Sequence, residues 1–319
     1  MHPAFSVIFF TVVSGCGYGL LFLIGALLLA DPRLLGSEAA IALALAALAS
    51  AAGLSSSMFH LGQPQRAWRA FSQWRSSWLS REGVAASLSF LPVGALLVAP
   101  WLHADATVVR ALALALATLA IVTVYCTAQI YASLKTIPAW HNGYVTSGYV
   151  LFALLGGAAW LCALHALMGK ALRLAGLQWL VLLLAIAAAL LKLAYWRFID
   201  TQPLPANTGI ATGLARFGSV RSAEAPHTEQ NYLTREMGFA LARKHSARLR
   251  RIALVFIAPL PIALLLVAML AAAGAMPLAF VAALTITLGL FVERWLFFAE
   301  AKHVVMLYYG ARDAESRSN

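Results

Sequence analysis

A histidine, an arginine and a glutamate lie close together between two long apolar runs of the sequence. His60 ends one run, Arg66 follows it, and Glu82 opens the next run. An imidazole that titrates near neutral pH and a carboxylate can move protons, and a guanidinium can donate hydrogen bonds to an oxygen. A quinone needs such groups, because protons accompany the electrons when it is reduced or oxidised. Segment 59–82 is therefore a candidate quinone site.

Each of these residues also has a structural interpretation. Glu82 can be a first-turn carboxylate that the helix dipole stabilises. Arg66 can pair with lipid phosphate, which its chemistry alone favours. The tryptophans of the same segment, Trp68, Trp74 and Trp78, fit an aromatic belt at a membrane surface better than a cage around a cofactor. From the residues alone, these alternatives stay open.

A second polar element lies near the C-terminal end of the chain, in another apolar run. Glu293 and Glu300 are spaced as i and i+7, so they share one face of a helix, and His303 follows Glu300 at i+3. We expect both carboxylates to face the helix bundle, because a charge in lipid is costly. Two interpretations remain, a part in proton transfer or structural ion pairs. The candidate cations for such pairs are Lys192, Arg197, Arg294 and Lys302.

The composition places these residues in a membrane protein. Of the 319 residues, 62% are apolar and 11% are charged. In a typical soluble domain, about a quarter of all residues are charged. The net charge of +11 does not indicate nucleic acid as a partner, because the basic residues lie between and beside the apolar runs. The three cysteines lie inside apolar runs and form no Cys-x-x-Cys pair, which argues against an iron–sulfur or zinc site.

Eight apolar runs approach or exceed the roughly 20 residues that a membrane-spanning helix needs. The sequence therefore predicts an all-α polytopic membrane protein, an eight-helix bundle that forms a single integral membrane domain over residues 1–319. The first run is too long for a cleavable signal peptide and has no basic segment before it, so we expect it to remain as a helix. The runs are Ala4–Ala30, Ala39–Phe59, Gly83–Leu102, Val108–Leu134, Tyr144–Met168, Leu172–Ile199, Ile252–Gly274 and Pro277–Leu307.

The basic residues predict how the protein sits in the membrane. An even number of spans puts both termini on one side, together with segment 59–82. Of the 23 lysines and arginines, 17 fall on that side, 4 on the other and 2 within spans. The positive-inside rule then places both termini in the cytoplasm, and we expect a multi-pass protein of the bacterial inner membrane.

The connection 200–251 is the longest segment that we expect outside the membrane. Its first half is rich in Pro, Gly, Ser and Thr and is expected to be irregular. Its second half, Thr228–Arg251, is expected to be a helix, either at the membrane surface or as a docking surface for a soluble partner. Within the spans, Pro92, Pro259 and Pro261 predict local kinks.

Three other functions are less consistent with the residues. Haem b needs axial ligands, usually two histidines that face each other at depth, and no histidine lies in mid-helix opposite another, so we expect no haem. A secondary transporter needs a site at the midplane and an inverted repeat, and neither is visible. A purely structural anchor without quinone chemistry remains a third alternative.

Several motifs together resemble the membrane anchor subunit of dimethyl sulfoxide reductase and its relatives, and the resemblance extends over essentially the whole sequence. The combination is fairly specific to that family, though not to one substrate. The motifs are His60-Leu61-Gly62-Gln63-Pro64-Gln65-Arg66-Ala67, Trp78-Leu79-Ser80-Arg81-Glu82, Ile137-Pro138-Ala139-Trp140-His141, residues 231–239 and residues 293–303.

The resemblance implies a three-subunit complex. A catalytic subunit holds molybdopterin-guanine dinucleotide, and a ferredoxin-like subunit holds [4Fe–4S] clusters. The anchor attaches both to the membrane and exchanges electrons with ubiquinone or menaquinone, without haem. The quinone-binding residues that the family implies match His60, Arg66 and Glu82.

The substrate is chosen on the catalytic subunit, so only indirect arguments apply here. The N-terminal run from Met1 to Thr11 and the segment Glu293–His303 look closer to the anchor of membrane-bound sulfite dehydrogenase, whose catalytic subunits are cytoplasmic. The charge count agrees with that side. We therefore favour sulfite oxidation over the alternative, a menaquinol-oxidising dimethyl sulfoxide reductase. The quinone type and the direction of electron flow in the cell are left open.

Overall fold

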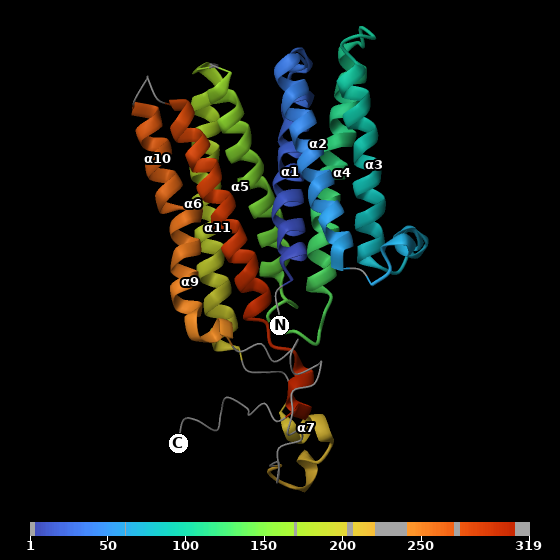
Figure 1. Cartoon of the computed structure of the whole chain (residues 1–319), viewed down its shortest axis with the longest axis vertical. Coiled ribbons are helices and arrows are strands. Elements are labelled where there is room, and N and C mark those ends of the chain that lie inside the picture. The colour runs from blue at the N-terminus through green and yellow to red at the C-terminus, as the bar shows by residue number, and fades with distance from the viewer. Residues whose placement is uncertain are drawn as a thin grey trace.

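The computed structural model shows a bundle of long helices (Figure 1). It describes residues 4–60, 62–168, 171–202, 207–220, 241–270 and 275–309. All regular elements within these ranges are helical, and 8 helices are long and apolar enough to cross a membrane. The predicted fold class, an all-α polytopic membrane protein with eight spans, is confirmed.

The spanning helices follow the apolar runs of the sequence closely, because about 20 apolar residues both form a helix and match the thickness of a bilayer. Their bounds are α1 (Phe5–Ala30), α2 (Ser37–Ser57), α3 (Trp78–Val98), α4 (Ala106–Ala132), α5 (Gly143–Leu167), α6 (Ala171–Thr201), α9 (Leu241–Ile257) continued by α10 (Pro259–Leu270), and α11 (Ala275–Ala299). The connections carry short helices, η1 (Pro32–Leu34), η2 (Met58–His60), η3 (Pro64–Gln73), α7 (Thr208–Thr212), η4 (Ala215–Phe217) and η5 (Val304–Tyr309).

The prolines behave in two ways. The seventh span is interrupted at Ala258, just before Pro259, which has no N–H to continue the hydrogen-bond ladder. Pro261 lies in the first turn of α10, where a missing N–H is tolerated. α3, by contrast, continues as one helix through Pro92.

Three predicted boundaries are wrong, and one of them is the start of the seventh span, whose helix α9 begins at Leu241 rather than Ile252. α3 begins at Trp78 rather than Gly83, so Glu82 lies inside the helix rather than at its opening. α11 ends at Ala299 rather than Leu307, because a polar stretch follows and the separate helix η5 comes after it. Most of the helix predicted over Thr228–Arg251 lies outside the described residues, and its last part belongs to α9.

The helices form two groups that meet at α1 and α5 (Figure 1). α1 packs against α2, α4 and α5, and α5 packs against α6 and α11. At the meeting point the two backbones touch, because Gly19 of α1 faces the Ala153 carbonyl and Gly157 of α5 faces the backbone of Gly19 and Leu20. Small residues at such positions let membrane helices approach closely.

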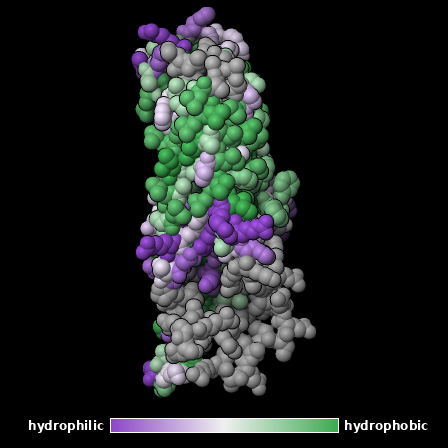
Figure 2. All heavy atoms as spheres, turned by 90° about the vertical axis from the view of Figure 1, so that its left-hand side faces the viewer, coloured by the Kyte–Doolittle hydropathy of each residue, from purple (hydrophilic) through white to green (hydrophobic). Residues whose placement is uncertain are grey.

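The two ends of the bundle are polar and its middle is apolar, as Figure 2 shows for one face. The first residue of α1 and the last residues of α2, α4, α6 and α11 lie at the same end of the bundle, the lower end in Figure 1. This end also carries η3, α7 and η5. We call it the terminal end of the bundle.

Candidate functional site

Glu82 is a buried carboxylic acid near the terminal end of the bundle. Its residue is only 3% exposed, in the second turn of α3. It lies against α4, where Thr127 donates a hydrogen bond from Oγ1 to Glu82 Oε1. An unpaired carboxylate is costly in such surroundings, so a first-turn position beside a helix dipole does not by itself explain this residue.

The Thr127 hydroxyl has more than one neighbour. Its Oγ1 also lies 3.0 Å from the carbonyl oxygen of Thr123. A threonine hydroxyl carries one proton and two lone pairs. When Thr127 donates to the Thr123 carbonyl, a protonated Glu82 can donate to Thr127. Either group can therefore be the donor in the hydrogen bond between them, depending on whether Glu82 is protonated.

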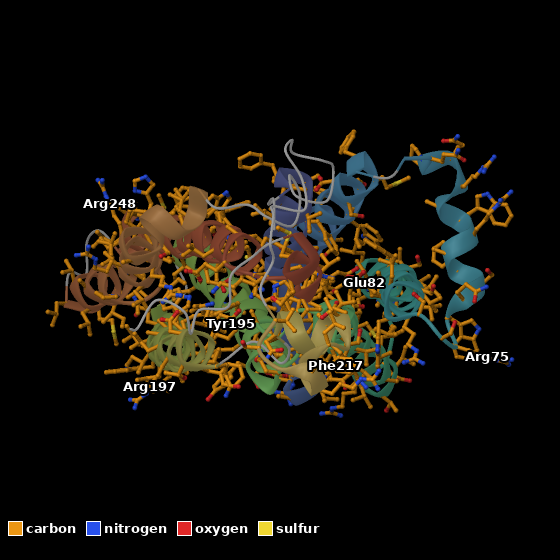
Figure 3. All side chains as sticks on the ribbon, turned by 90° about the horizontal axis from the view of Figure 1, so that it is seen from below. Arg75, Glu82, Tyr195, Arg197, Phe217 and Arg248 are labelled. Atoms are coloured by element: carbon orange, nitrogen blue, oxygen red, sulfur yellow. The ribbon has the colours of Figure 1, made fainter. Side chains whose placement is uncertain are left out.

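The structure does not test the grouping of His60 and Arg66 with Glu82. His60 is the last residue of η2, directly after α2, and its side chain lies outside the described part of the structure. Arg66 lies in η3 and is exposed. Figure 3, which looks onto the terminal end, shows Arg75 just beyond η3 at the outer edge of the molecule, whereas Glu82 lies within the helices.

Two tryptophans of this segment, Trp68 and Trp74, are exposed beside cations, as an interfacial belt requires. Trp68 is 67% and Trp74 52% exposed, and the guanidinium carbons of Arg69 and Arg75 lie 5.6 and 5.4 Å from their ring centroids. Amphipathic rings with neighbouring cations are typical of the headgroup level of a membrane.

Glu293 is the centre of a buried ion cluster. Its Oε1 lies 2.7 Å from Lys192 Nζ, and its Oε2 lies 3.0 Å from Arg294 Nε. The three residues are each at most 4% exposed. Lys192 and Arg294 were among the cations expected from the sequence, and Glu293 contacts both; whether it serves as an ion pair alone or also in proton transfer stays a prediction. The cluster holds one carboxylate for two cations.

Aromatic rings line this cluster. Lys192 Nζ lies 4.1 Å from the ring centroid of Tyr195, and Arg294 Cζ lies 4.0 Å from that of Tyr149. The negative face of an aromatic ring attracts a cation, and the attraction is stronger away from water. The rings therefore offset part of the cost of burying the additional positive charge.

Glu300 has a partner that the sequence did not indicate. It follows the end of α11 and pairs with Arg250 of α9, at 2.7 Å between Oε1 and Nε. Arg250 also binds the exposed Asp200 at the end of α6. Burial raises the pKa of Glu300, while Arg250 opposes that shift. Figure 3 shows that Arg197, one of the expected partners, lies on the outer side of α6 instead.

His303 lies three residues beyond Glu300, outside the helix. Its Nδ1 accepts a hydrogen bond from the backbone N–H of Val305 at 3.0 Å. Partial burial lowers the pKa of this imidazole. The bond fixes the start of η5 and favours the neutral ring. The two interpretations of His303, proton transfer or a structural ion pair, stay predictions.

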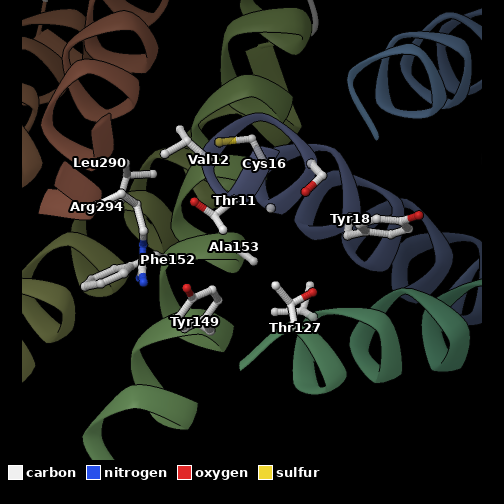
Figure 4. A pocket seen from close by; sticks show the side chains of 13 residues that line it. Thr11, Val12, Cys16, Tyr18, Thr127, Tyr149, Phe152, Ala153, Leu290 and Arg294 are labelled. Atoms are coloured by element: carbon white, nitrogen blue, oxygen red, sulfur yellow. The ribbon is translucent and has the colours of Figure 1, made fainter. Parts of the chain in front are cut away.

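A cavity that no pattern in the sequence indicated lies between α1, α4, α5 and α11. It has room for about one or two water molecules. Figure 4 shows Thr127 and Tyr18 on one side of it and Tyr149 and Arg294 on the other. Its polar lining consists of Thr11, Ser14, Tyr18, Thr127, Tyr149 and Arg294.

Two hydroxyl oxygens on residues that line this cavity, Tyr18 Oη and Tyr149 Oη, have no hydrogen-bond partner in the described part of the structure. Buried hydroxyls normally have a partner, and a cavity of this size can supply one as water. Isolated hydroxyl residues in apolar helices have no distinctive spacing, so the sequence could not mark them. Within the described ranges, no group of three His, Cys, Asp or Glu side chains could hold a metal ion.

Residues 1–310 match the family described as DMSO reductase anchor subunit (DmsC). The protein belongs to this family. It is 34% identical to a subunit of sulfite dehydrogenase from Allochromatium vinosum, over 97% of its own length and 99% of that relative. It is also similar to two anaerobic dimethyl sulfoxide reductase chains of Escherichia coli, YnfH at 35% identity and a second one at 31% identity, each over 33% of its own length and 37% of the relative. This protein is therefore a multi-pass membrane anchor subunit of an oxidoreductase complex of this type.

Proposed function

We propose that this anchor binds a quinone and passes electrons to it from an iron–sulfur partner during sulfite oxidation. The similarity to a sulfite dehydrogenase subunit along nearly the full length of both proteins supports this proposal most directly. The similarity to the dimethyl sulfoxide reductase relatives extends over about a third of the sequence. The partners would be a ferredoxin-like subunit with [4Fe–4S] clusters and a catalytic subunit with molybdopterin-guanine dinucleotide.

The buried carboxyl of Glu82 fits the needs of such a site. A quinone supplies the two-electron chemistry, and the protein must deliver protons to its oxygens and exclude unwanted water. Glu82 can lose a proton and regain it through Thr127, which contacts it directly. His60 and Arg66 would complete the site, as second proton carrier and hydrogen-bond donor, where the loop after α2 approaches the start of α3.

The first prediction concerns Glu82→Gln in the purified three-subunit complex. Quinone-coupled sulfite oxidation should fall about tenfold or more, because an amide cannot carry the proton. Sulfite oxidation with a soluble dye as acceptor should stay unchanged, since it bypasses the membrane subunit. Glu38→Gln at the start of α2, at the opposite end of the bundle, is the matched control. Unchanged quinone-coupled turnover in Glu82→Gln and in His60→Ala would support a purely structural anchor instead.

The second prediction concerns the side of the membrane on which the partners bind. We propose that the terminal end of the bundle faces the cytoplasm of a bacterial inner membrane, since 17 of the 23 lysines and arginines were assigned to that side. The native cysteines are buried, so a membrane-impermeant thiol reagent should report introduced ones. In intact spheroplasts, Arg33→Cys should be labelled and Arg75→Cys should not. The reverse pattern would contradict the orientation.

The similarity to the two Escherichia coli relatives favours a second candidate, the anchor of a dimethyl sulfoxide reductase that oxidises menaquinol. The two candidates differ in substrate and in the direction of electron flow. Purified complex that reduces dimethyl sulfoxide with a quinol, and does not oxidise sulfite with a quinone, would decide for the second.

A further inference from the structure

A second cavity lies beside the buried ion cluster, between α5, α6 and α11. Its lining includes Tyr144, Lys192, Tyr195, Glu293 and Arg294. The first cavity also includes Arg294, together with Phe152. The two cavities therefore share the side chains of Phe152 and Arg294, whereas Lys192 and Glu293 line only the second one.

Most polar groups of the two cavities lie at a similar depth, which Glu82 shares, whereas Tyr18 lies deeper in α1. Each group at this shared depth lies within roughly one to three turns of the end of its helix, at the terminal end of the bundle. These groups are Thr11 of α1, Glu82 of α3, Thr127 of α4, Tyr149 of α5, Lys192 of α6 and Arg294 of α11. They form a buried polar layer that crosses the bundle from α3 to α6, from one helix group into the other.

The two ends of this layer differ in access to water. At one end, Glu82 is buried and reaches the first cavity through Thr127, which lines it. At the other end, the second cavity extends to Tyr144, the second residue of α5, which is only half-buried. A proton that enters beside Tyr144 would thus meet the ion cluster before it meets Glu82.

The charges of the cluster single out Lys192 as its proton carrier. In direct contact the cluster has two cations for one carboxylate, and the next acid to Lys192 is Glu300, which is itself paired with Arg250. Arginine does not give up its proton in proteins, whereas a buried lysine does so readily. Loss of a proton from Lys192 leaves the neutral pair of Glu293 and Arg294, which removes the cost of the additional charge.

We propose that the two cavities form a water-containing proton path from the surface beside Tyr144 to Glu82, with Lys192 as the residue that relays the proton. This inference rests on the proposed quinone chemistry. Each quinone that is reduced takes two electrons from the iron–sulfur subunit and two protons from the protein. For each proton, Glu82 releases its own to a quinone oxygen, regains one from Lys192 through water and Thr127, and Lys192 is reprotonated from the second cavity.

The test compares Lys192→Met with Lys192→Arg in the intact complex, with a short-chain quinone as acceptor. Methionine leaves Glu293 and Arg294 as a balanced pair, and arginine keeps the positive charge but cannot release its proton. Both variants should lower kcat about tenfold or more, with little change in KM for the quinone and a larger solvent deuterium isotope effect. Lys302→Met, an exposed lysine just beyond α11, is the matched control and should behave as wild type.

A structural role for Lys192 predicts a different pattern, in which Lys192→Arg restores wild-type turnover, and that result would overturn the proposal. Tyr149→Phe gives a second measurement if the lysine variants assemble poorly, since it removes only an unpartnered hydroxyl from the first cavity. It should lower kcat about threefold or more and leave KM unchanged, and wild-type kcat in this variant would count against the path. Wild-type complex that cannot reduce quinone at all would instead refute the proposed function.

Discussion

Replacement of Glu293 by glutamine should destabilise this subunit strongly, so that little folded subunit is found in the complex. Glu293 is the only carboxylate that contacts Lys192 and Arg294 among the described ion pairs, and both cations are buried. Removal of one partner from a buried ion pair costs about 3–5 kcal/mol, because the remaining charge has neither water nor a counter-ion. Here two cations would lose their partner together, so we expect the upper part of that range.

The amount of subunit that survives extraction in mild detergent, and the midpoint of its thermal unfolding, would measure this loss. A double variant, Glu293→Gln with Lys192→Met, separates charge from shape. It has the same net charge in the cluster as the wild type, so it should recover much of the stability that the single variant loses. A double variant as unstable as the single one would show that the lost hydrogen bonds, rather than the charge, account for the effect.

Asp200→Asn is the matched control for this prediction. The pair of Asp200 and Arg250 is as short as that of Glu293 and Lys192, at 2.6 Å, but the Asp200 side chain is 55% exposed. Exposed pairs contribute about 0–1 kcal/mol, because water solvates both charges when the pair is broken. Equal losses in the two variants would contradict our view that burial makes the Glu293 cluster important.

The fold could be predicted from the sequence because each span is a long apolar run whose end is marked by polar residues, proline or glycine. The first run was expected over Ala4–Ala30, and α1 covers Phe5–Ala30. The start of α3 was missed because Trp78 and Glu82 look polar or interfacial in a hydropathy pattern. They are helical because they pack against α4, where Trp78 meets Tyr125 and Glu82 meets Thr127. A contact between distant segments cannot be read from local hydropathy.

The candidate site could be predicted only in part. Helical spacing indicated that Glu293 faces the bundle, and its partners Lys192 and Arg294 were two of the four cations named as candidates. The pairing of Glu300 with Arg250 joins residues that are 50 positions apart and depends on how α9 packs beside α11. The hydroxyls around the first cavity carry no pattern in the sequence, because single serines, threonines and tyrosines are common in membrane helices.

The contact between the two helix groups leads to the second large expected effect, that of Gly19→Ala. In an isolated helix this substitution is favourable by about 1 kcal/mol. Here the added methyl group would overlap the backbone carbonyl of Ala153 in α5. A side chain can relieve an overlap by changing its rotamer, but a helix backbone cannot, so α1 and α5 would have to separate. We expect a loss of about 3 kcal/mol or more, at the upper end of what overpacking costs in a core.

Gly94→Ala provides the matched control, because nothing lies within 4 Å of a methyl group added there. It should be neutral or slightly stabilising, in line with helix propensity. Because Cys16 and Ala153 belong to the lining of the first cavity and lie beside the same contact, a partly assembled Gly19→Ala complex should also lose quinone-coupled turnover. Thermal unfolding like that of the wild type in Gly19→Ala would mean that α1 and α5 do not approach as closely in the membrane as described here.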